Sequence, residues 1–407
     1  MTGRGAAQVA ANWRGTARRV VDSGESSDLR HSKKQQTRTF SRLGKPGTAG
    51  KTSPLILETF YRKQISGESR GVMPSMIRCV LRGLSAPYGL FMSLRNMAFD
   101  LGVRKSTCVS VPVIAIGNLT TGGTGKTPIV ATVVKALQEQ GLRPGIVSRG
   151  YRADATGEND EKLVLELLCP NVPHEQNPNR VVASEKLIAS EGVDVIVLDD
   201  AFQHRRIVRD LNVILIDATN PFGYGYQLPR GLLREPVSSL SRADVVLITR
   251  SDNVSEAALQ EIEATIRRHN SHLADHIYRV SFCPSGLIAR GGNHERSIDL
   301  VRNRPVTVMT AIGNPEAFMM TCRQIEAEIV ATQFFPDHHH YTQKDLDEVR
   351  GLAAKAGAPL ILTTLKDLVK VPDRYDDFFA VDIETVFESA DKQPKFRDEL
   401  ARATKMH

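Results

Sequence analysis

A glycine-rich turn between an apolar strand and a helix constrains this 407-residue chain more than any other feature. The segment reads IGNLTTGGTGKTP from Ile116 to Pro128, and a compact β-branched run at 111–116 leads into it. Glycines let the backbone approach phosphate oxygens closely, and the free N–H groups of the following helix attract an anion. Pro128 suits an early helical position, where its missing N–H costs nothing. The pattern predicts a phosphate-binding loop in an α/β fold.

The loop assigns an expected role to each of its polar residues. Lys126 would neutralise the β- and γ-phosphates of ATP, and the Thr127 hydroxyl would ligate Mg²⁺. Thr120 stands where the common pattern has its first glycine, so the match is to the GGTGKT variant. A glycine-rich turn without a nucleotide is disfavoured, because strand, loop, Lys-Thr pair and helix fall in register. The expected nucleotide-binding residues are Thr121, Gly122, Gly123, Thr124, Gly125, Lys126 and Thr127.

A second apolar run, Val195–Leu198, ends in a pair of aspartates. In nucleotide-binding α/β folds the ligands lie beyond the carboxyl ends of the strands, where an aspartate can hold Mg²⁺ directly or through water. Asp199 is the first candidate metal ligand and Asp200 the second. Gln203 and His204, which follow, could equally orient a phosphate or cap the next element.

Short apolar strands alternate with helical stretches, which predicts a parallel sheet with helices on both faces. We expect a P-loop NTPase-like domain at 111–290 and a smaller α/β domain at 300–407, with a junction near 285–304. The expected strands are 111–116, 145–148, 194–198, 212–216 and 244–249 in the first domain, and 306–311, 329–335 and 359–364 in the second. The expected helices are 128–140, 315–325 and 343–356.

The N-terminal segment 1–72 holds 14 Lys/Arg and 5 Asp/Glu and shows little periodicity apart from Leu55-Ile56-Leu57. We interpret it as a basic, mostly disordered extension. It could anchor the chain to anionic lipid, but a dispensable extension or a start codon assigned too early is favoured, with Met73 and Met76 as candidate starts.

Residues 73–110 are expected to form an N-terminal helical segment beside a membrane. Apolar residues are dense, and arginines punctuate them. The longest uncharged run, Gly83–Leu94, contains Pro87 and is shorter than the ~20 residues that span a bilayer. Periodicity alone divides evenly between an interfacial, Arg-flanked segment and a helix pair buried against the core.

Charge and cysteine content narrow the class of protein. Residues 1–72 carry a net charge of +9 and the remaining chain −2, which together give the +7 of the whole chain. A basic tail on a slightly acidic body argues against a nucleic-acid partner. The five scattered cysteines form no C-x-x-C pair, so neither a disulfide framework nor a zinc site is indicated. A reducing cytosol fits best.

Several motifs in succession resemble those of the tetraacyldisaccharide 4′-kinase (lipid A 4′-kinase) family, from about Met76 to the C-terminus. The first domain contributes VIAIGNLTTGGTGKTP (113–128), SRGY (148–151), LDDAFQHRR (198–206) and LPRGLLREP (228–236). The second contributes AIGNPEAF (311–318), FPDHHHYT (335–342) and TTLKDLVK (363–370). Departures from the family pattern are Ala201 after the paired aspartates, Arg152 after SRGY, and Asn159–Lys162 in place of a GDEP segment.

The resemblance implies phosphorylation of the 4′-hydroxyl of an acylated glucosamine disaccharide 1-phosphate, with ATP and Mg²⁺. It places the protein peripherally at the cytoplasmic face of the inner membrane, with residues 76–103 as the element that contacts the membrane. It also points to Asp160 as the catalytic base, with His338 as its partner. On this interpretation the active site lies between the two domains. The alternative is that Asp160 caps a helix and that His338 packs at a strand end.

Other residues are candidates for supporting roles. Arg149, Arg205 and Arg234 could contact phosphates of ATP or the substrate, although each is as able to form a structural ion pair. Glu235 could support the metal shell. The run His338–His340 is a poor metal site, because adjacent residues project in different directions.

Two rival functions belong to other classes. GGTGKT loops also occur in dimeric ATPase switches that act through a protein partner, but those usually carry a lysine where this chain has Thr121. The second α/β domain also has no place in such a switch. A carboxylate-activating synthetase is possible on the fold alone.

Overall fold

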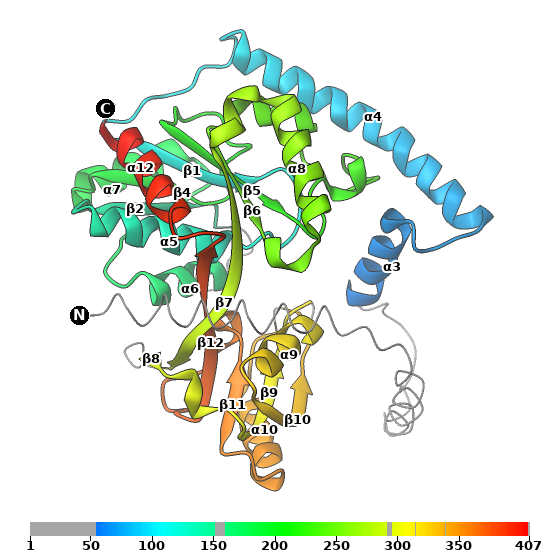
Figure 1. Ribbon diagram of the computed structural model, residues 1–407, viewed down its shortest axis with the longest axis vertical. Coiled ribbons are helices and arrows are strands. Elements are labelled where there is room, and N and C mark those ends of the chain that lie inside the picture. The colour runs from blue at the N-terminus through cyan, green and yellow to red at the C-terminus, as the bar shows by residue number, and fades with distance from the viewer. Residues whose placement is uncertain (1–53, 151–158, 291–294, 314, 338, 406–407) are drawn as a thin grey trace. The chain divides into compact units, whose positions relative to one another are not determined.

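The computed structural model describes residues 54–150, 159–290, 295–313, 315–337 and 339–405 (Figure 1). Its strands form one mixed sheet in which most neighbours are parallel. The α/β class predicted from the alternation of strands and helices is therefore confirmed.

The first half of the sheet carries the glycine-rich loop, and its neighbouring strands are all parallel. In spatial order its strands are β6 (Val245–Thr249), β5 (Leu211–Asp217), β1 (Val113–Asn118), β4 (Val195–Leu198), β2 (Pro144–Ser148) and β3 (His174–Gln176). Strands covered on both faces read as nearly continuous apolar runs, so the sequence predicts five of them. The exception is β3, whose His-Glu-Gln residues carry no apolar signal.

The second half of the sheet is the smaller α/β set. Its strands follow the order β10 (Glu328–Phe334), β9 (Pro305–Thr310), β11 (Leu360–Thr363) and β12 (Phe378–Phe387), again parallel. The three expected strands are confirmed. The expectation that 359–364 is the final strand is wrong, because β12 follows it.

Two long strands, β12 and β7 (Ile277–Ala289), join the halves by pairing with each other. β7 pairs in parallel with β6 at its beginning and antiparallel with β12 along the rest of its length. A two-residue strand, β8 (Glu295–Arg296), pairs with β7 at the side. Figure 1 shows β7 passing from one half into the other. The expected junction near 285–304 thus begins inside β7. Pro284 and Gly286 are atypical of strand interiors, so the sequence does not indicate this strand.

Helices cover both faces of the first half. Buried residues of α5 (Lys126–Glu139) pack on one face and those of α8 (Glu256–His269) on the other. The first half also carries α6 (Asp160–Leu168) and α7 (Arg180–Glu191), and the second α9 (Pro315–Gln324), α10 (Gln343–Lys355) and the short α11 (Leu365–Leu368).

The last helix, α12 (Lys392–Lys405), returns to the first half. Its Phe396, Leu400 and Ala403 belong to the same buried cluster as α5. The domain boundaries 111–290 and 300–407 stay a prediction. The packing of α12 on the first half means that not all of 300–407 packs with the second half.

The N-terminal region has more structure than expected. Helix α3 (Pro54–Ser66) falls within the segment interpreted as mostly disordered, and that interpretation is wrong for these residues. Ile65 is fully buried, and the Tyr61 hydroxyl donates to Pro229 O at 2.6 Å. The apolar run 55–57 was the available signal. Residues 1–53 lie outside the described residues.

Helix α4 (Val72–Asp100) follows as a single 29-residue helix that continues through Pro87. The helical character expected for 73–110 is confirmed over most of that range. Within the described residues, no helix combines the length and apolar character needed to cross a bilayer.

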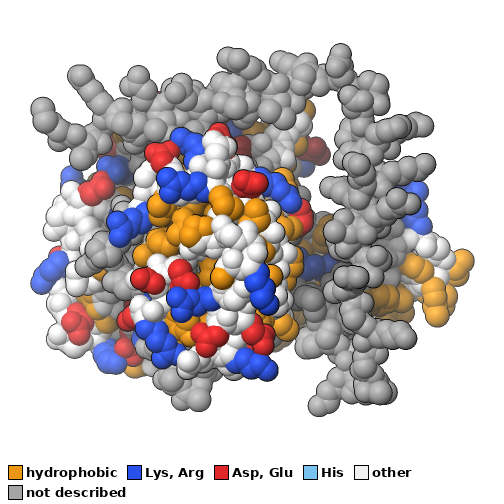
Figure 2. Space-filling model, turned by 90° about the horizontal axis from the view of Figure 1, so that it is seen from below, with side chains coloured by type: hydrophobic (Ala, Val, Ile, Leu, Met, Phe, Trp, Pro, Cys, Tyr) orange, Lys and Arg blue, Asp and Glu red, His pale blue; other side chains and the backbone are white. Residues whose placement is uncertain are grey.

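Figure 2 views the structure along its long axis, from the end that carries the second half of the sheet. On the face it shows, basic and acidic side chains are interspersed around apolar ones.

Candidate active site

The glycine-rich loop connects β1 to α5 and has the backbone that a phosphate cradle requires. Gly122 and Gly125 have φ values of 124° and 81°, a region that favours glycine. A Cβ on Gly125 would also overlap the ring of Phe282 from β7. Lys126 and Thr127 open the first turn of α5, as the sequence predicts.

Residues from distant segments hold this loop in place. The Thr249 hydroxyl, at the end of β6, donates to Thr124 O at 3.0 Å, and Arg250 Nη1 donates to Gly123 O at 3.0 Å. Arg250 also pairs with Asp217 at the end of β5. No local pattern in the sequence selects these residues, because only the sheet order brings the ends of β5 and β6 beside β1.

Asp200 lies between two cations. Its carboxylate is 3.4 Å from Lys126 Nζ and accepts from Arg234 Nη1 at 2.9 and 3.0 Å. Burial raises the pKa of the Asp200 carboxyl, but the charges of Lys126 and Arg234 outweigh it and the net pKa is lowered. Lys126 Nζ is also 3.3 Å from Asn118 Oδ1. Arg234 thus contacts both oxygens of Asp200, and Lys126 lies close to one of them.

Asp199 has a different environment. Burial raises its pKa to about 6, although the Lys126 charge opposes the shift. Its Oδ1 is buried and has no hydrogen-bond partner among the described residues. A buried carboxylate oxygen beside a phosphate loop suits a cation, since Mg²⁺ is usually held by one or two carboxylates together with phosphates and water. The described residues contain no cluster of three His, Cys, Asp or Glu side chains that could hold a metal unaided.

Arg180 is a functional candidate that the sequence analysis missed. It is the first residue of α7 and is buried, and Asn179 caps the helix before it. Burial lowers the pKa of Arg180 to about 10, while the charges of Asp199 and Asp200 oppose the shift. Its Nε is buried without a partner among the described residues. An arginine directly after an Asn cap was the only local signal.

Asp160 is the first residue of α6 and does not cap it. Asn159 is the cap, since its Oδ1 accepts from Lys162 N at 2.9 Å. The alternative that Asp160 caps a helix is thus wrong. The Asp160 carboxylate instead pairs with Lys370 Nζ from the second half at 2.7 Å.

The second half also brings its histidine-rich loop toward Asp160. Burial and Asp367 raise the pKa of Tyr341, and the charge of Asp160 adds to the shift, which places that carboxylate near the loop. His339 stacks on Phe335 and lies 3.1 Å from Asp345 Oδ2. His338 lies outside the described residues, so its pairing with Asp160 stays a prediction.

Helix α4 is fastened to the loops that flank the site. The Tyr88 hydroxyl donates to Arg234 O at 2.9 Å, and Asn96 Nδ2 donates to Glu235 Oε2 at 2.9 Å. Glu235 is fully buried and pairs with Arg242 as well. It therefore ties α4 to the LREP segment, which leaves little support for its expected role in a metal shell.

Two of the candidate phosphate-binding arginines make structural contacts. Arg205 pairs with Asp100 at 2.7 Å and donates to Asn96 O at 3.0 Å, both on α4. Arg234 pairs with Asp200 and remains beside the loop.

The outer face of α4 is apolar and exposed. Phe91 is 62% exposed and Val80 63% exposed, although both are large apolar residues. The exposed apolar side chains of α4 are Val72, Met73, Met76, Val80, Leu84, Leu90, Phe91, Leu94 and Met97, and the exposed Leu101 and Val103 follow directly after the helix. Exposed apolar patches of this kind mark interaction surfaces. We call the residues of this set that lie in the helix the apolar face of α4.

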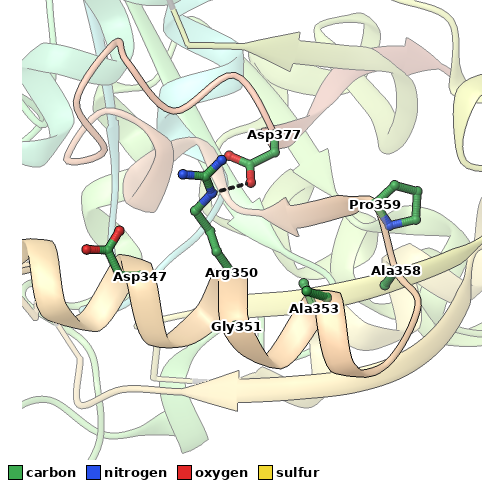
Figure 3. A pocket seen from close by; sticks show the side chains of 8 residues that line it. Asp347, Arg350, Gly351, Ala353, Ala358, Pro359 and Asp377 are labelled. Carbon is green, nitrogen blue, oxygen red and sulfur yellow. Dashed lines mark hydrogen bonds and ion pairs between the residues drawn. The ribbon is translucent and has the colours of Figure 1, made fainter.

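A hollow of about 490 Å³ lies elsewhere, between α10 and the strand ends of the second half (Figure 3). Arg350 Nε donates to Asp377 Oδ2 at 2.7 Å across it, and Asp347, alanines, a glycine and a proline line the rest. No residue of the glycine-rich loop lines this hollow.

Comparison with known proteins identifies the group to which this site belongs. The profile of the tetraacyldisaccharide-1-P 4′-kinase (LpxK) family matches residues 77–405. A tetraacyldisaccharide 4′-kinase from Halothermothrix orenii is 32% identical over 339 residues, covering 77% of this chain and 88% of that protein. One from Anaeromyxobacter dehalogenans is 33% identical over 320 residues, covering 75% and 84%.

A solved structure shares the fold. The crystal structure of LpxK from Aquifex aeolicus in complex with ATP superposes with a TM-score of 0.67 at 24% identity. It covers 81% of this chain and 99% of that chain.

Proposed function

This chain belongs to the tetraacyldisaccharide-1-P 4′-kinase family, and from that premise we propose that it transfers the γ-phosphoryl group of ATP to the 4′-hydroxyl of a tetraacylated glucosamine disaccharide 1-phosphate. It is a kinase of lipid A biosynthesis. The observation that carries the mechanism is the convergence of Lys126, Asp199 and Asp200 at the glycine-rich loop. ATP as phosphoryl donor is supported by the related enzyme solved with ATP.

Phosphoryl transfer needs charge neutralisation and alignment more than covalent chemistry. In this proposal the loop amides 121–127 cradle the phosphates and Lys126 lies against the β- and γ-oxygens. Arg234 leaves Lys126 free to turn toward phosphate, because it already neutralises Asp200 at 2.9 Å. Asp199 and Thr127 would hold Mg²⁺, with Asp200 in support. When bound, the ion would neutralise charge on the transferred phosphoryl group.

The acceptor hydroxyl must lose a proton as its oxygen attacks phosphorus. We assign this proton to Asp160, with His338 as its partner. Asp160 stands at the N-terminus of α6, beside both halves of the sheet, where an acceptor can meet a nucleotide bound at the loop.

The substrate is a lipid, so the site must reach a membrane surface. The apolar face of α4 supports peripheral binding at that surface. Because α4 is also fastened to the loops around Arg234 and Gln203, this binding would bring the site close to the membrane. We propose that the chain works at the cytoplasmic face of the inner membrane, where ATP is available.

The direct test supplies tetraacyldisaccharide 1-phosphate in mixed micelles with ATP and Mg²⁺ and detects the bisphosphorylated lipid by mass spectrometry. Lys126→Ala should lower kcat by about 10²-fold or more while circular dichroism stays unchanged. Lys135→Ala, on the same helix, is the control. ATP hydrolysis without a phosphorylated lipid would instead favour the interpretation as an ATPase switch that acts through a protein partner.

A further inference from the structure

The pair Asp160–Lys370 joins the two halves of the sheet at the candidate base. Helix α6 itself packs on both halves: Leu165 belongs to the buried cluster of α5, and Leu168 packs against that cluster and against the one under β11 and β12. The position of the Asp160 carboxylate is therefore set jointly by the first and second halves.

Hydrogen bonds hold the backbone at Lys370 in place. Its backbone N donates to Asp367 O at 3.0 Å, directly after α11. The Asp367 side chain is fully buried and accepts from Thr310 Oγ1 at 2.9 Å and Thr364 Oγ1 at 2.7 Å. Lys370 is thus fixed to the carboxyl ends of β9 and β11, where an active-site group of an α/β fold is expected.

The pair is largely shielded from water. The side chains of Lys370 and Asp160 are 9% and 18% exposed, and Nζ lies 2.7 Å from Oδ2. A carboxylate at this depth is costly to bury without a paired cation. Lys370 supplies that cation, and its 2.7 Å contact fixes the direction of the carboxylate.

We propose that Lys370 is a positioning residue for the phosphoryl transfer, which holds Asp160 as an oriented carboxylate toward the acceptor hydroxyl. The proposal rests on the proposed role of Asp160 as proton acceptor. A single lysine from the second half would then make the base competent only when both halves are in place around it.

Other titratable groups surround Asp160. Glu161 and Lys162 lie on its own helix, and Lys162 pairs with Glu166 at 3.5 Å. Tyr341 and Asp367 approach from the second half. Tyr341 adds no negative charge beside Asp160, because burial raises the pKa of its phenol and keeps it neutral.

The test compares Lys370→Met, Lys370→Arg and the control Lys355→Met at the exposed end of α10. Lys370→Met should lower kcat by about 10- to 100-fold and leave KM for ATP unchanged. Lys370→Arg, which keeps the charge, should recover most of kcat. Wild-type kcat in Lys370→Met would overturn the proposal, as would a loss that Lys370→Arg does not relieve.

Asp160→Asn separates this inference from the proposed function. If Asp160→Asn keeps full kcat, the proposed base is wrong. If Asp160→Asn loses activity and Lys370→Met does not, only the role of Lys370 is wrong. On the Asp160→Asn background, adding Lys370→Met should cost little further activity, because both act through one group. That double variant leaves no charge unpaired, so it also serves if Lys370→Met alone does not fold.

Discussion

The surroundings of Asp199 disfavour the ionised form of its carboxyl group. Burial raises its pKa to about 6, despite the nearby charge of Lys126. Because the folded pKa exceeds the unfolded one, the contribution of this group to stability is fully present below the unfolded pKa and is lost as pH rises through about 6. A cation at Asp199 competes with the proton, so its affinity should fall as pH falls through the same value.

Asp199→Asn keeps the shape of this side chain and removes its charge. We expect the variant to be more stable than wild type in urea at about pH 8, by up to about 3 kcal/mol, with the gain shrinking toward about pH 5. Kinase activity should fall by about 10²-fold or more. Asp194→Asn is the matched control, because Asp194 is near the same strand but its pKa is lowered by its hydrogen bond to Arg143. A variant less stable than wild type at high pH would contradict this account.

Local motifs identified part of the site, and sheet order supplied the rest. Lys126 could be predicted because it ends a recognisable glycine-rich loop after an apolar strand, and Asp199 and Asp200 because they directly follow another apolar strand. Arg180 and Arg250 could not, because their place beside the loop depends on strands that are distant in the chain. Lys370 lies in the motif 363–370, but its sequence context indicates no role, because its partner Asp160 lies 210 positions earlier.

At the scale of elements, α4 has two faces with separate tasks. Tyr88 and Asn96 fasten it to the loop that holds Arg234, and Phe91 and Leu94 remain exposed on the apolar face of α4. One face should thus affect catalysis and the other membrane binding.

Substitutions on the two faces should separate these tasks. Asn96→Ala removes a donor to the buried Glu235, which costs about 1.5–3 kcal/mol for a hydrogen bond to a charged group. We expect a several-fold lower kcat on micellar substrate with unchanged binding to vesicles. Phe91→Ser/Leu94→Ser should weaken binding to anionic vesicles by about tenfold or more and leave kcat on a dispersed substrate near wild type. Vesicle sedimentation and the micellar assay measure both, and equal effects of the two variants on both assays would refute the division.

Apart from the short β3 and β8, the strands that the sequence could not predict are β7 and β12, which join the two halves. Runs such as β4 and β6 are short and wholly apolar, so they stand out. β7 contains Pro284 and Gly286, and β12 alternates acidic and apolar residues, so neither reads as a buried parallel strand. Both serve as antiparallel partners across the junction, a pairing that no local pattern encodes.

At the scale of the whole molecule, both ends of the described chain return to the P-loop half. α12 completes the cluster beneath α5, and α3 reaches the loop before Arg234. Arg230 Nη1 donates to Ile65 O at 2.8 Å, which adds a second contact between α3 and that loop. The N-terminal region therefore contributes to the folded body and not only to a membrane surface.

A truncation series should locate where that contribution begins. A chain starting at Pro54 keeps α3 and should retain wild-type kcat and vesicle binding. A chain starting at Met76 loses buried Ile65 and the contacts of Tyr61 and Arg230, so its free energy of unfolding should fall by about 2–4 kcal/mol. Its kcat should fall several-fold, because the loop that carries Arg234 loses an anchor. Urea unfolding and the micellar assay on both chains, with Tyr61→Phe as a single-contact control, decide the matter: equal stability and kcat in the two truncations would show that α3 is dispensable.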